Sequence, residues 1–281
     1  NQASVDARLR AGGATNLTLK GKATIPSGAG PLSGSAAVTG TIDVAPFASL
    51  LGNDLRNITG TLRPNLTLDL SGSRISGSGG IDFTNGAVAL PESGMRLSGG
   101  EGRIALQGDT VQVQRLTFQT GRNGTLSATG TVRLDAAQGV APDISVTSRN
   151  ALLVNRPDLV AVISSSLEVS GSTASGIDIS GPITIDRAEI FVGSQQSADF
   201  PTIEVREINK PGAPPPSAQP AARRPPAETA TPIRLALAIR APQAVFVRGR
   251  GLDAEMSGDL QVGGSPAAPT VVGGLTMRRG E

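Results

Sequence analysis

The sequence predicts an all-β protein in which repeated short strands form one extended sheet with a single apolar face. Throughout the 281 residues, short runs of alternating apolar and polar residues are separated by glycine, serine, threonine and asparagine, which is the pattern of a β-meander. The chain contains 36 glycines, whereas aromatic residues make up only 2%. Because large side chains are too few to fill the space between two packed sheets, this composition favours a thin structure over a thick globule.

One unit of alternating residues occurs three times and defines the strand pattern. The central copy runs from Leu167 to Val192, an earlier copy begins at Leu68, and a later copy begins at Leu260. In each copy, alternating apolar residues lead into a glycine-rich turn, and the run that follows contains one step of three residues. Such a step in a period-two pattern indicates a β-bulge. Each copy therefore predicts two strands joined by a turn, with a bulge in the returning strand.

Two other local patterns predict defined elements in the first half of the chain. Between Pro46 and Leu51 the apolar residues are spaced as on a helix, so we expect a short helix that ends near Gly52, at an end or edge of the sheet. Asn123-Gly124 predicts a hairpin turn, since both residues tolerate positive φ.

A further hairpin is predicted between Arg248 and Glu255. With Gly251-Leu252 as a two-residue type II′ turn, Arg250 lies opposite Asp253 and Arg248 lies opposite Glu255. The four charges then share one face, and oppositely charged cross-strand neighbours favour that register. Val247 and Met256 meet on the other face.

Residues 209–232 interrupt the strand pattern. They read NKPGAPPPSAQPAARRPPAETATP, a proline density that no central strand accepts. We expect a disordered Pro/Ala-rich insertion in a loop. Residues 1–208 and 233–281 are then two parts of one continuous sheet structure.

Composition also excludes several classes of function. The chain has no histidine and no cysteine, so zinc sites, thiol nucleophiles and histidine-based catalysis are excluded. The arginines are scattered, which argues against a nucleic-acid partner. Aspartates such as Asp82 and Asp186 alternate with apolar residues, and nothing pairs two of them as acid and base, so we expect no enzyme activity and no cofactor. A signal-peptide core and a long apolar run are also missing, which indicates either a cytosolic protein or an internal piece of a longer exported chain.

A resemblance to a known family covers most of the chain and is most specific in residues 245–264. The run from Val245 to Glu255, VFVRGRGLDAE, is followed by Gly258-Asp259-Leu260, by Val262-x-Gly264, and by Pro269 and Gly273. This series resembles the C-terminal half of the TamB family, the bacterial translocation-and-assembly-module proteins of the AsmA-like group. The sequence departs from the family by its Pro/Ala insertion. It also lacks the family's N-terminal membrane anchor and final segment.

The resemblance implies a periplasmic β-taco, a long sheet curled into a U-shaped trough with an apolar interior. Proteins of this kind are linked to phospholipid movement between the two membranes of Gram-negative envelopes. They are also linked to outer-membrane protein assembly with a TamA-type barrel partner, and an anchor absent here would hold the protein in the inner membrane. About twenty strands at a spacing of about 4.8 Å would give a trough on the order of 90 Å long.

If the trough carries lipid, its floor is made by the apolar residues of the alternating runs. The expected lipid-contacting residues are Leu66, Leu68, Leu70, Ile81, Phe83, Val132, Leu134, Leu167, Val169, Ile183, Ile185, Leu235, Leu237, Leu260, Val262, Leu275 and Met277. Two other interpretations stay open at this point. The groove could hold unfolded outer-membrane strands by pairing with its sheet edges, or the chain could be a structural β-solenoid whose apolar interior is only a core.

The insertion generates the first testable expectation. Limited digestion of the purified chain with trypsin should cut first near Arg223 and Arg224, because a proline-rich loop without stable structure is open to proteases. The bond cut is the one after Arg223, since trypsin does not cleave between Arg224 and Pro225. Mass spectrometry of the earliest fragments identifies the site. Resistance at this bond, while other sites are cut, would show that the segment is docked.

Overall fold

The computed structural model describes residues 2–11, 14–24, 33–51, 55–71, 74–135, 139–193 and 231–280. These residues form fourteen β-strands and one 3-10 helix. The strands are β1 (Gln2–Ala11), β2 (Thr15–Thr24), β3 (Ser33–Asp43), β4 (Arg56–Ser71), β5 (Arg74–Leu90), β6 (Met95–Gly108), β7 (Thr110–Thr120), β8 (Gly124–Asp135), β9 (Gly139–Asn155), β10 (Leu159–Ser172), β11 (Gly176–Phe191), β12 (Ile233–Gly249), β13 (Leu252–Ser265) and β14 (Ala268–Gly280). The 3-10 helix η1 spans Ala45–Leu51.

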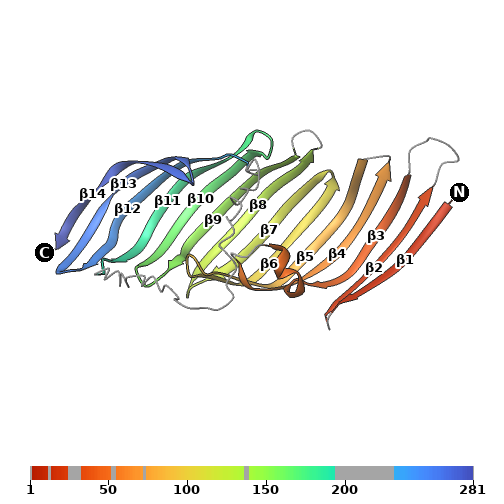
Figure 1. The fold of residues 1–281 in the computed structure, drawn as a ribbon, viewed down its shortest axis with the longest axis horizontal. Helices are drawn as coiled ribbons and strands as arrows, with labels where there is room; N and C mark the ends of the chain where they lie inside the picture. Colours follow the sequence, from red (N-terminus) through yellow and green to blue (C-terminus); the bar gives the residue numbers. More distant parts are fainter. Residues whose placement is uncertain are drawn as a thin grey trace, which may run out of the picture.

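All fourteen strands belong to one curled sheet, in which they follow one another in sequence order from β1 to β14 (Figure 1). Every neighbouring pair is antiparallel except β11 and β12, which are parallel. The all-β fold and the curled sheet predicted from the sequence are therefore confirmed. The segment 209–232 lies outside the described residues as far as residue 230.

The expected strand number is wrong, because the strands are longer than the spacing of the alternating runs suggests. The strands of the described ranges have 10 to 17 residues each. Runs that look separate in the sequence join through bulges into single strands, as in β4, where register shifts occur near Thr59. Fourteen strands at about 4.8 Å extend over roughly 60 Å, compared with the expected 90 Å.

Each of the three sequence repeats is a hairpin. The repeats correspond to β4–β5, β10–β11 and β13–β14, and all three returning strands carry the bulge that the three-residue step predicts. In β5 the register shifts between Phe83 and Gly86, and in β11 it shifts between Thr184 and Ala188. In β14, Arg278 is the additional residue, since Met277 and Arg279 lie opposite consecutive residues of β13.

Each returning strand contains a glycine at the start of its alternating apolar run, and the local backbone requires glycine at that position. Gly79, Gly181 and Gly273 have φ values of +117°, +133° and +128°, a conformation that residues with a Cβ rarely adopt. A Cβ built on any of the three would overlap a carbonyl oxygen of the preceding strand. The repeated glycine therefore allows two backbones to approach more closely than any larger residue permits.

Register shifts that mark bulges occur in every strand pair from β4 to β14 except β8–β9, and we call the line that they form the crease. Several bulge residues have left-handed backbone, including Asn57 (φ 51°), Asn85 (φ 56°), Asn150 (φ 45°) and Ala244 (φ 63°). A bulge bends its strand and increases the local twist. Because the bends follow one another along the sheet, the sheet folds along the crease from β4 to β14, with one arm of the sheet on each side of it.

Small residues fill the crease in its C-terminal half. Ala161, Ala188, Ala241 and Val245 form a buried cluster, with side chains between 2% and 6% exposed. Ile163, Ile185, Ile190 and Met256 are among the half-buried residues that pack against it. Alanines on adjacent strands let the two arms of the sheet approach each other closely, so this part of the crease is a true core.

In the N-terminal half of the crease, phenylalanine rings pack over glycines of the neighbouring backbone. The Phe83 and Phe118 ring centroids lie 6.0 Å apart with an interplanar angle of 55°. A Cβ on Gly86 would overlap the Phe83 ring, and one on Gly100 would overlap the Phe118 ring. The rings therefore occupy space that the glycines leave open. Phe83, expected from the sequence to contact lipid, also packs the crease.

The predicted short helix is present as η1 and connects β3 to β4. It is a 3-10 helix of seven residues that begins at Ala45, where the Ala45 N–H donates to Asp43 Oδ1 at 3.1 Å. The Phe47 N–H donates to the Val44 carbonyl oxygen at 2.9 Å. The helix contacts β4, and the side-chain hydrogen bond at Asp43 explains where the helix begins.

The β12–β13 hairpin forms, but the predicted register and turn are wrong. Its turn residues are Arg250 (φ 55°) and Gly251 (φ 87°), so Gly249 pairs with Leu252 and Arg248 lies opposite Asp253. Positive φ at both central positions is the property of a type I′ turn, whose twist matches that of the flanking strands. Opposite charges alone do not decide between the two registers, because Arg248 also meets an acidic residue, Asp253, in the observed one.

The hairpin at Asn123-Gly124 is confirmed with a different turn. Thr120 pairs with Gly124, which already belongs to β8, so the loop has three residues and Gly121 (φ 62°) takes the left-handed conformation. At this position of β8 the sheet requires glycine, because a Cβ on residue 124 would lie 2.5 Å from the Asn150 carbonyl oxygen of β9.

The close approach at the repeated glycine predicts a large effect of one methyl group. Gly181→Ala should lower the free energy of unfolding by about 2–4 kcal/mol, because it adds both a strained φ and an overlap with the Ser166 carbonyl. Gly274→Ala is the control, since a Cβ at Gly274 meets nothing within 4 Å. It should change stability by less than about 0.5 kcal/mol. Equal urea-unfolding midpoints for the two variants would contradict this account.

Candidate functional site: an open apolar trough

One face of the sheet carries mainly apolar residues and glycines from β1 to β14. Directly opposite residues share a face, so the register traces that face across every strand pair. Leu68 lies opposite Ala36 and Gly77, and Leu237 lies opposite Gly181 and Val262. Within the described ranges, the register places no charged side chain on this face. We call it the trough floor.

The structure brings all seventeen residues expected to contact lipid onto the trough floor. They lie on β4 (Leu66, Leu68, Leu70), β5 (Ile81, Phe83), β8 (Val132, Leu134), β10 (Leu167, Val169), β11 (Ile183, Ile185), β12 (Leu235, Leu237), β13 (Leu260, Val262) and β14 (Leu275, Met277). Most are half-buried, whereas Leu134, Leu275 and Met277 are 50%, 39% and 54% exposed. Their contact with lipid stays a prediction, and Phe83 and Ile185 also pack the crease.

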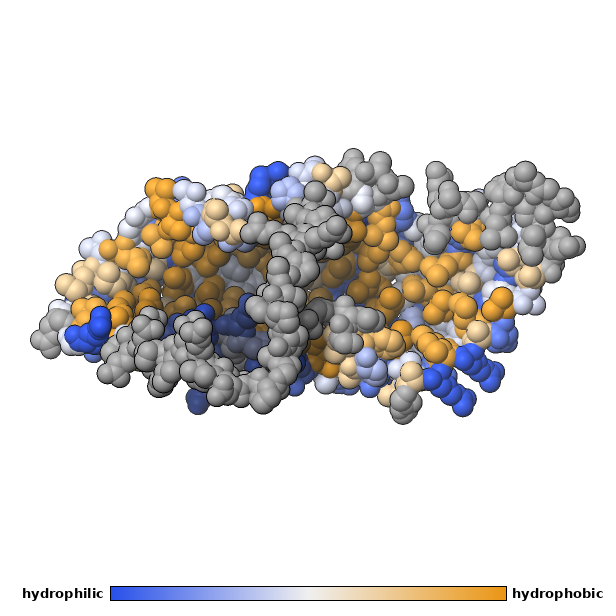
Figure 2. Space-filling view, in the orientation of Figure 1, coloured by the Kyte–Doolittle hydropathy of each residue, from blue (hydrophilic) through white to orange (hydrophobic). Residues whose placement is uncertain are grey.

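Figure 2 shows the apolar residues gathered in the hollow of the curled sheet, while hydrophilic residues lie along its margins. The sheet is a single layer in the described chain, so no second layer covers the floor. Large apolar side chains consequently stay exposed, among them Val5 (53%), Leu9 (54%) and Val140 (43%). A contiguous exposed apolar surface of this extent marks a binding surface for an apolar partner.

The floor contains further residues that the seventeen omit. Ile144 lies opposite Val169, Ile179 lies opposite both Val169 and Leu235, and Ile239 lies opposite Ile183. The same period-two alternation that found the others is present around these isoleucines, so the sequence signal was sufficient to find them. On β1 and β2 the floor residues Val5 and Leu19 follow the same rule.

One polar pair lies on the floor beside the crease. The hydroxyls of Ser148 and Ser165 are 2.9 Å apart, and the Ser148 hydroxyl lies 3.2 Å from the carbonyl oxygen of Ile163. Ser148 is only 2% exposed. Ser165 can donate to Ser148, which in turn donates to the carbonyl, so both hydroxyls are satisfied and the floor presents no free polar group here.

The opposite, outer face carries the charges. Asp82 pairs with Arg103 at 3.3 Å, and Asp178 makes two bonds with Arg234, at 2.6 and 2.7 Å. The Arg234 hydrogen bonds lower the pKa of Asp178 below its ordinary value, and the Asp178 hydrogen bond raises the pKa of Arg234. The hydrogen bond from Arg279 likewise lowers the pKa of Glu255. The Asp82–Arg103 and Asp178–Arg234 pairs are exposed, whereas the Glu255 side chain is only 11% exposed; together these charges make the outer face water-soluble.

A scan against protein-family models matches residues 114–281 to the family described as TamB C-terminal domain. The match covers more than half of the chain. This chain belongs to the TamB family. Searches of the curated proteins and of the solved structures returned no match.

Membership places this TamB chain in a translocation and assembly module of the cell envelope, with a role in outer-membrane assembly. The matched segment begins in β7 and includes β8 to β14, with both later repeats. Among the described residues, no helix is long and apolar enough to cross a membrane. The same residues contain no cluster of three or more acidic side chains that could hold a metal ion.

The Asp178–Arg234 pair predicts a defined pH dependence. The folded-state pKa of Asp178 is below the ordinary value of 3.8, so the contribution of the pair to stability is complete above that pH and is lost as the pH falls through the folded-state pKa. Asp178→Asn should therefore lower the urea midpoint at neutral pH, and its difference from the parent should become smaller at a pH below 3.8.

Arg234→Gln provides the matched control, because it removes the other partner of the same pair. It should reproduce the loss at neutral pH, and the double variant should be no less stable than either single variant. A loss in Asp178→Asn that is equal at both pH values would show that the carboxylate stabilises the sheet by some means other than this ion pair.

Proposed function

We propose that this TamB chain binds the acyl chains of phospholipids along the trough floor and conducts them through the periplasm toward the outer membrane. The observation that carries the proposal is the trough floor itself, which runs through all fourteen strands without a charged side chain and has no covering layer among the described residues. A core that served only to stabilise the fold would be closed by a second layer.

The energetics suit a passive conduit. A phospholipid with two acyl chains has about 30 methylene groups, and exposing each to water costs about 0.8 kcal/mol, so transfer through water is unfavourable by roughly 20 kcal/mol or more. A continuous apolar floor removes most of this cost at every position along the path. It needs no catalytic residue and no cofactor, which agrees with the absence of histidine and cysteine in the chain.

The family supplies the setting of the proposal. Membership in the TamB family supports an envelope location and work within the translocation and assembly module. We assign the chain to the periplasm, joined to the inner membrane through an anchor outside this sequence and to the outer membrane through a TamA-type barrel protein. Delivery of lipid near that barrel would support outer-membrane protein assembly.

A second candidate function is a groove that holds unfolded outer-membrane strands. It is favoured by the edge strand β14, whose thirteen residues are all exposed, including Val271 (57%) and Val272 (64%). No described strand pairs with the outer edge of β14 or of β1. A free edge of this kind can add another strand. Binding of barrel-strand peptides without bound lipid would favour this function.

Photo-crosslinking on adjacent residues tests the conduit directly. A photoreactive residue at Val169, on the trough floor, should capture phospholipid in cells, whereas the same residue at Glu168, on the outer face, should not. Mass spectrometry of the purified adducts identifies the lipid. Equal labelling at the two positions would argue that the label reports random contact with membrane.

A charge on the floor tests transport itself. Leu237→Asp places a carboxylate in the apolar path and should interrupt lipid transfer, while Ala238→Asp, on the outer face of the same strand, should leave it intact. Leu237 is preferable to Ile185, because Ile185 packs against the buried alanine cluster. Normal envelope integrity in cells with a folded Leu237→Asp protein would contradict the conduit.

A further inference from the structure

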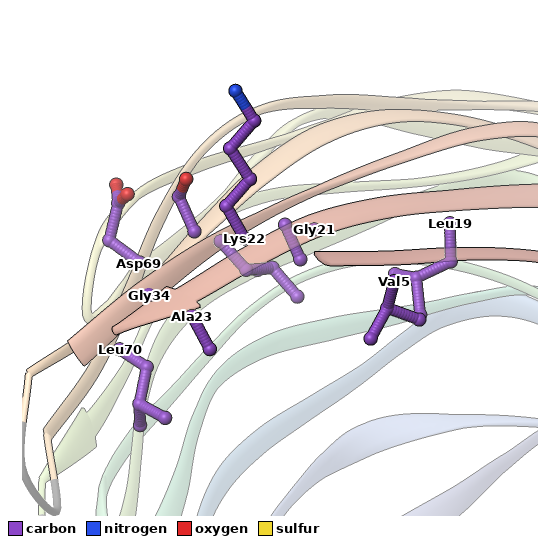
Figure 3. Close-up of a pocket in the computed structure, with 11 residues that line it drawn as sticks. Val5, Leu19, Gly21, Lys22, Ala23, Gly34, Asp69 and Leu70 are labelled. Carbon is purple, nitrogen blue, oxygen red and sulfur yellow. The ribbon is translucent and has the colours of Figure 1, made fainter. Parts of the chain in front are cut away.

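The N-terminal end of the trough contains a distinct apolar hollow of about 320 Å³ (Figure 3). Its walls come from β1 to β4. The side chains that face it from the trough floor are those of Val5, Leu19, Ala23, Ala36, Leu68 and Leu70. Figure 3 shows Leu70, Ala23 and Val5 on one side of the strands, with Lys22 and Asp69 pointing away on the other side.

The hollow exists because small residues lie at its centre and larger ones around it. Gly21 lies opposite both Val5 and Ala36, and Gly34 lies opposite Leu70. Gly34 cannot be enlarged, since a Cβ there would lie 2.7 Å from the Lys22 carbonyl oxygen. The pairings of β1 with β2 and of β2 with β3 contain no register shift, so the crease that closes the sheet elsewhere is absent here.

The chemistry of the hollow selects an alkyl chain. The three polar residues of its lining, Lys22, Ser35 and Asp69, belong by register to the outer face, so no polar side chain enters. A polar ligand would lose its hydrogen bonds to water without replacement. By contrast, the outer face has a hollow of about 680 Å³ lined by residues such as Thr117, Gln119 and Arg149.

The size of the hollow fits about two-thirds of one acyl chain, which has about 15 methylene groups. At about 30 Å³ per water molecule, 320 Å³ corresponds to about ten waters, and a methylene group is of similar size. The floor continues from Leu68 to Gly77 on β5 and onward along the trough, so an alkyl chain can enter the hollow without leaving the apolar surface.

We propose that this hollow is a discrete holding site for one phospholipid acyl chain, at which lipid pauses before or after its passage along the rest of the floor. This inference rests on the proposed conduit function.

Fluorescence quenching can report on the hollow and on the central floor separately. The chain has no cysteine, so Ala23→Cys and Val169→Cys each give a single position for a bimane label. The probe is a phosphatidylcholine with a nitroxide on one acyl chain, supplied in vesicles of that lipid. Quenching at both positions is expected. Quenching at residue 169 alone would overturn the holding site and leave the conduit standing, whereas no quenching at residue 169 would overturn the conduit.

Two adjacent alanines on opposite faces give a matched pair of variants. Ala36 lines the hollow, and Ala37 is exposed on the outer face of the same strand. In the Ala23→Cys background, Ala36→Phe should fill the hollow and abolish quenching there, while Ala37→Phe should not. In the Val169→Cys background, neither should reduce quenching. Undiminished quenching at residue 23 in Ala36→Phe would overturn the proposal.

Circular dichroism checks the fold of every variant. If Ala36→Phe does not fold, Ala36→Leu replaces it, because leucine also occupies the hollow with less added volume. The same loss of quenching at residue 23 is then expected, and undiminished quenching there would count against the holding site.

Discussion

The fold depends on one packing interaction, the contact between the two arms of a single sheet along the crease. A sheet with one apolar face normally buries that face against a second layer. Here the sheet bends upon itself at a row of bulges, and Ala161, Ala188, Ala241 and Val245 pack where the arms meet. In the N-terminal half, Phe83 over Gly86 fills the same line. The bulges bend the strands, and the small residues and phenylalanine rings pack along the bend. Together they give a sheet of consecutive strands the shape of a trough.

This device divides the apolar residues into two groups with different roles. Residues at the crease are buried and stabilise the bend, whereas those farther along each arm remain half-buried or exposed because no described strand packs over them. Buried residues of the crease and half-buried residues of the floor therefore lie on the same strand, as Ala188 and Ile179 do on β11. A surface that is both rigid and open suits transfer, since the floor keeps its shape while a partner moves across it. The hollow at β1 to β4 arises where the crease is missing.

Local patterns in the sequence predicted most of the floor, because period-two alternation is a direct consequence of strand geometry. The three-residue steps likewise predicted bulges at Gly86 and Ala188, and all three repeats are hairpins. Strand number, the turn at Arg250-Gly251 and the parallel pair could not be predicted in this way. Each depends on how separate segments align, and alternation is unchanged when a strand is extended through a bulge or when its direction is reversed. The burial of the crease alanines could not be predicted either, since it results from the bend of the sheet and not from the residues next to them in the sequence.

The parallel pair of β11 and β12 shows how continuity of the floor is preserved without a hairpin. Parallel pairing keeps directly aligned residues on one face, so Ile177 lies beside Ile233 and Ile183 beside Ile239. No tight turn can hold this pair, because β11 ends and β12 begins at opposite rims. Contacts on the outer face hold the two strands together at both rims instead. Near one rim, Arg234 binds Asp178. Near the other, the guanidinium groups of Arg187 and Arg248 lie 5.8 and 5.1 Å from the centroid of the Phe246 ring. The charges that make this face soluble thus also hold together the parallel pair of the described sheet, and none of these charged side chains lies on the trough floor.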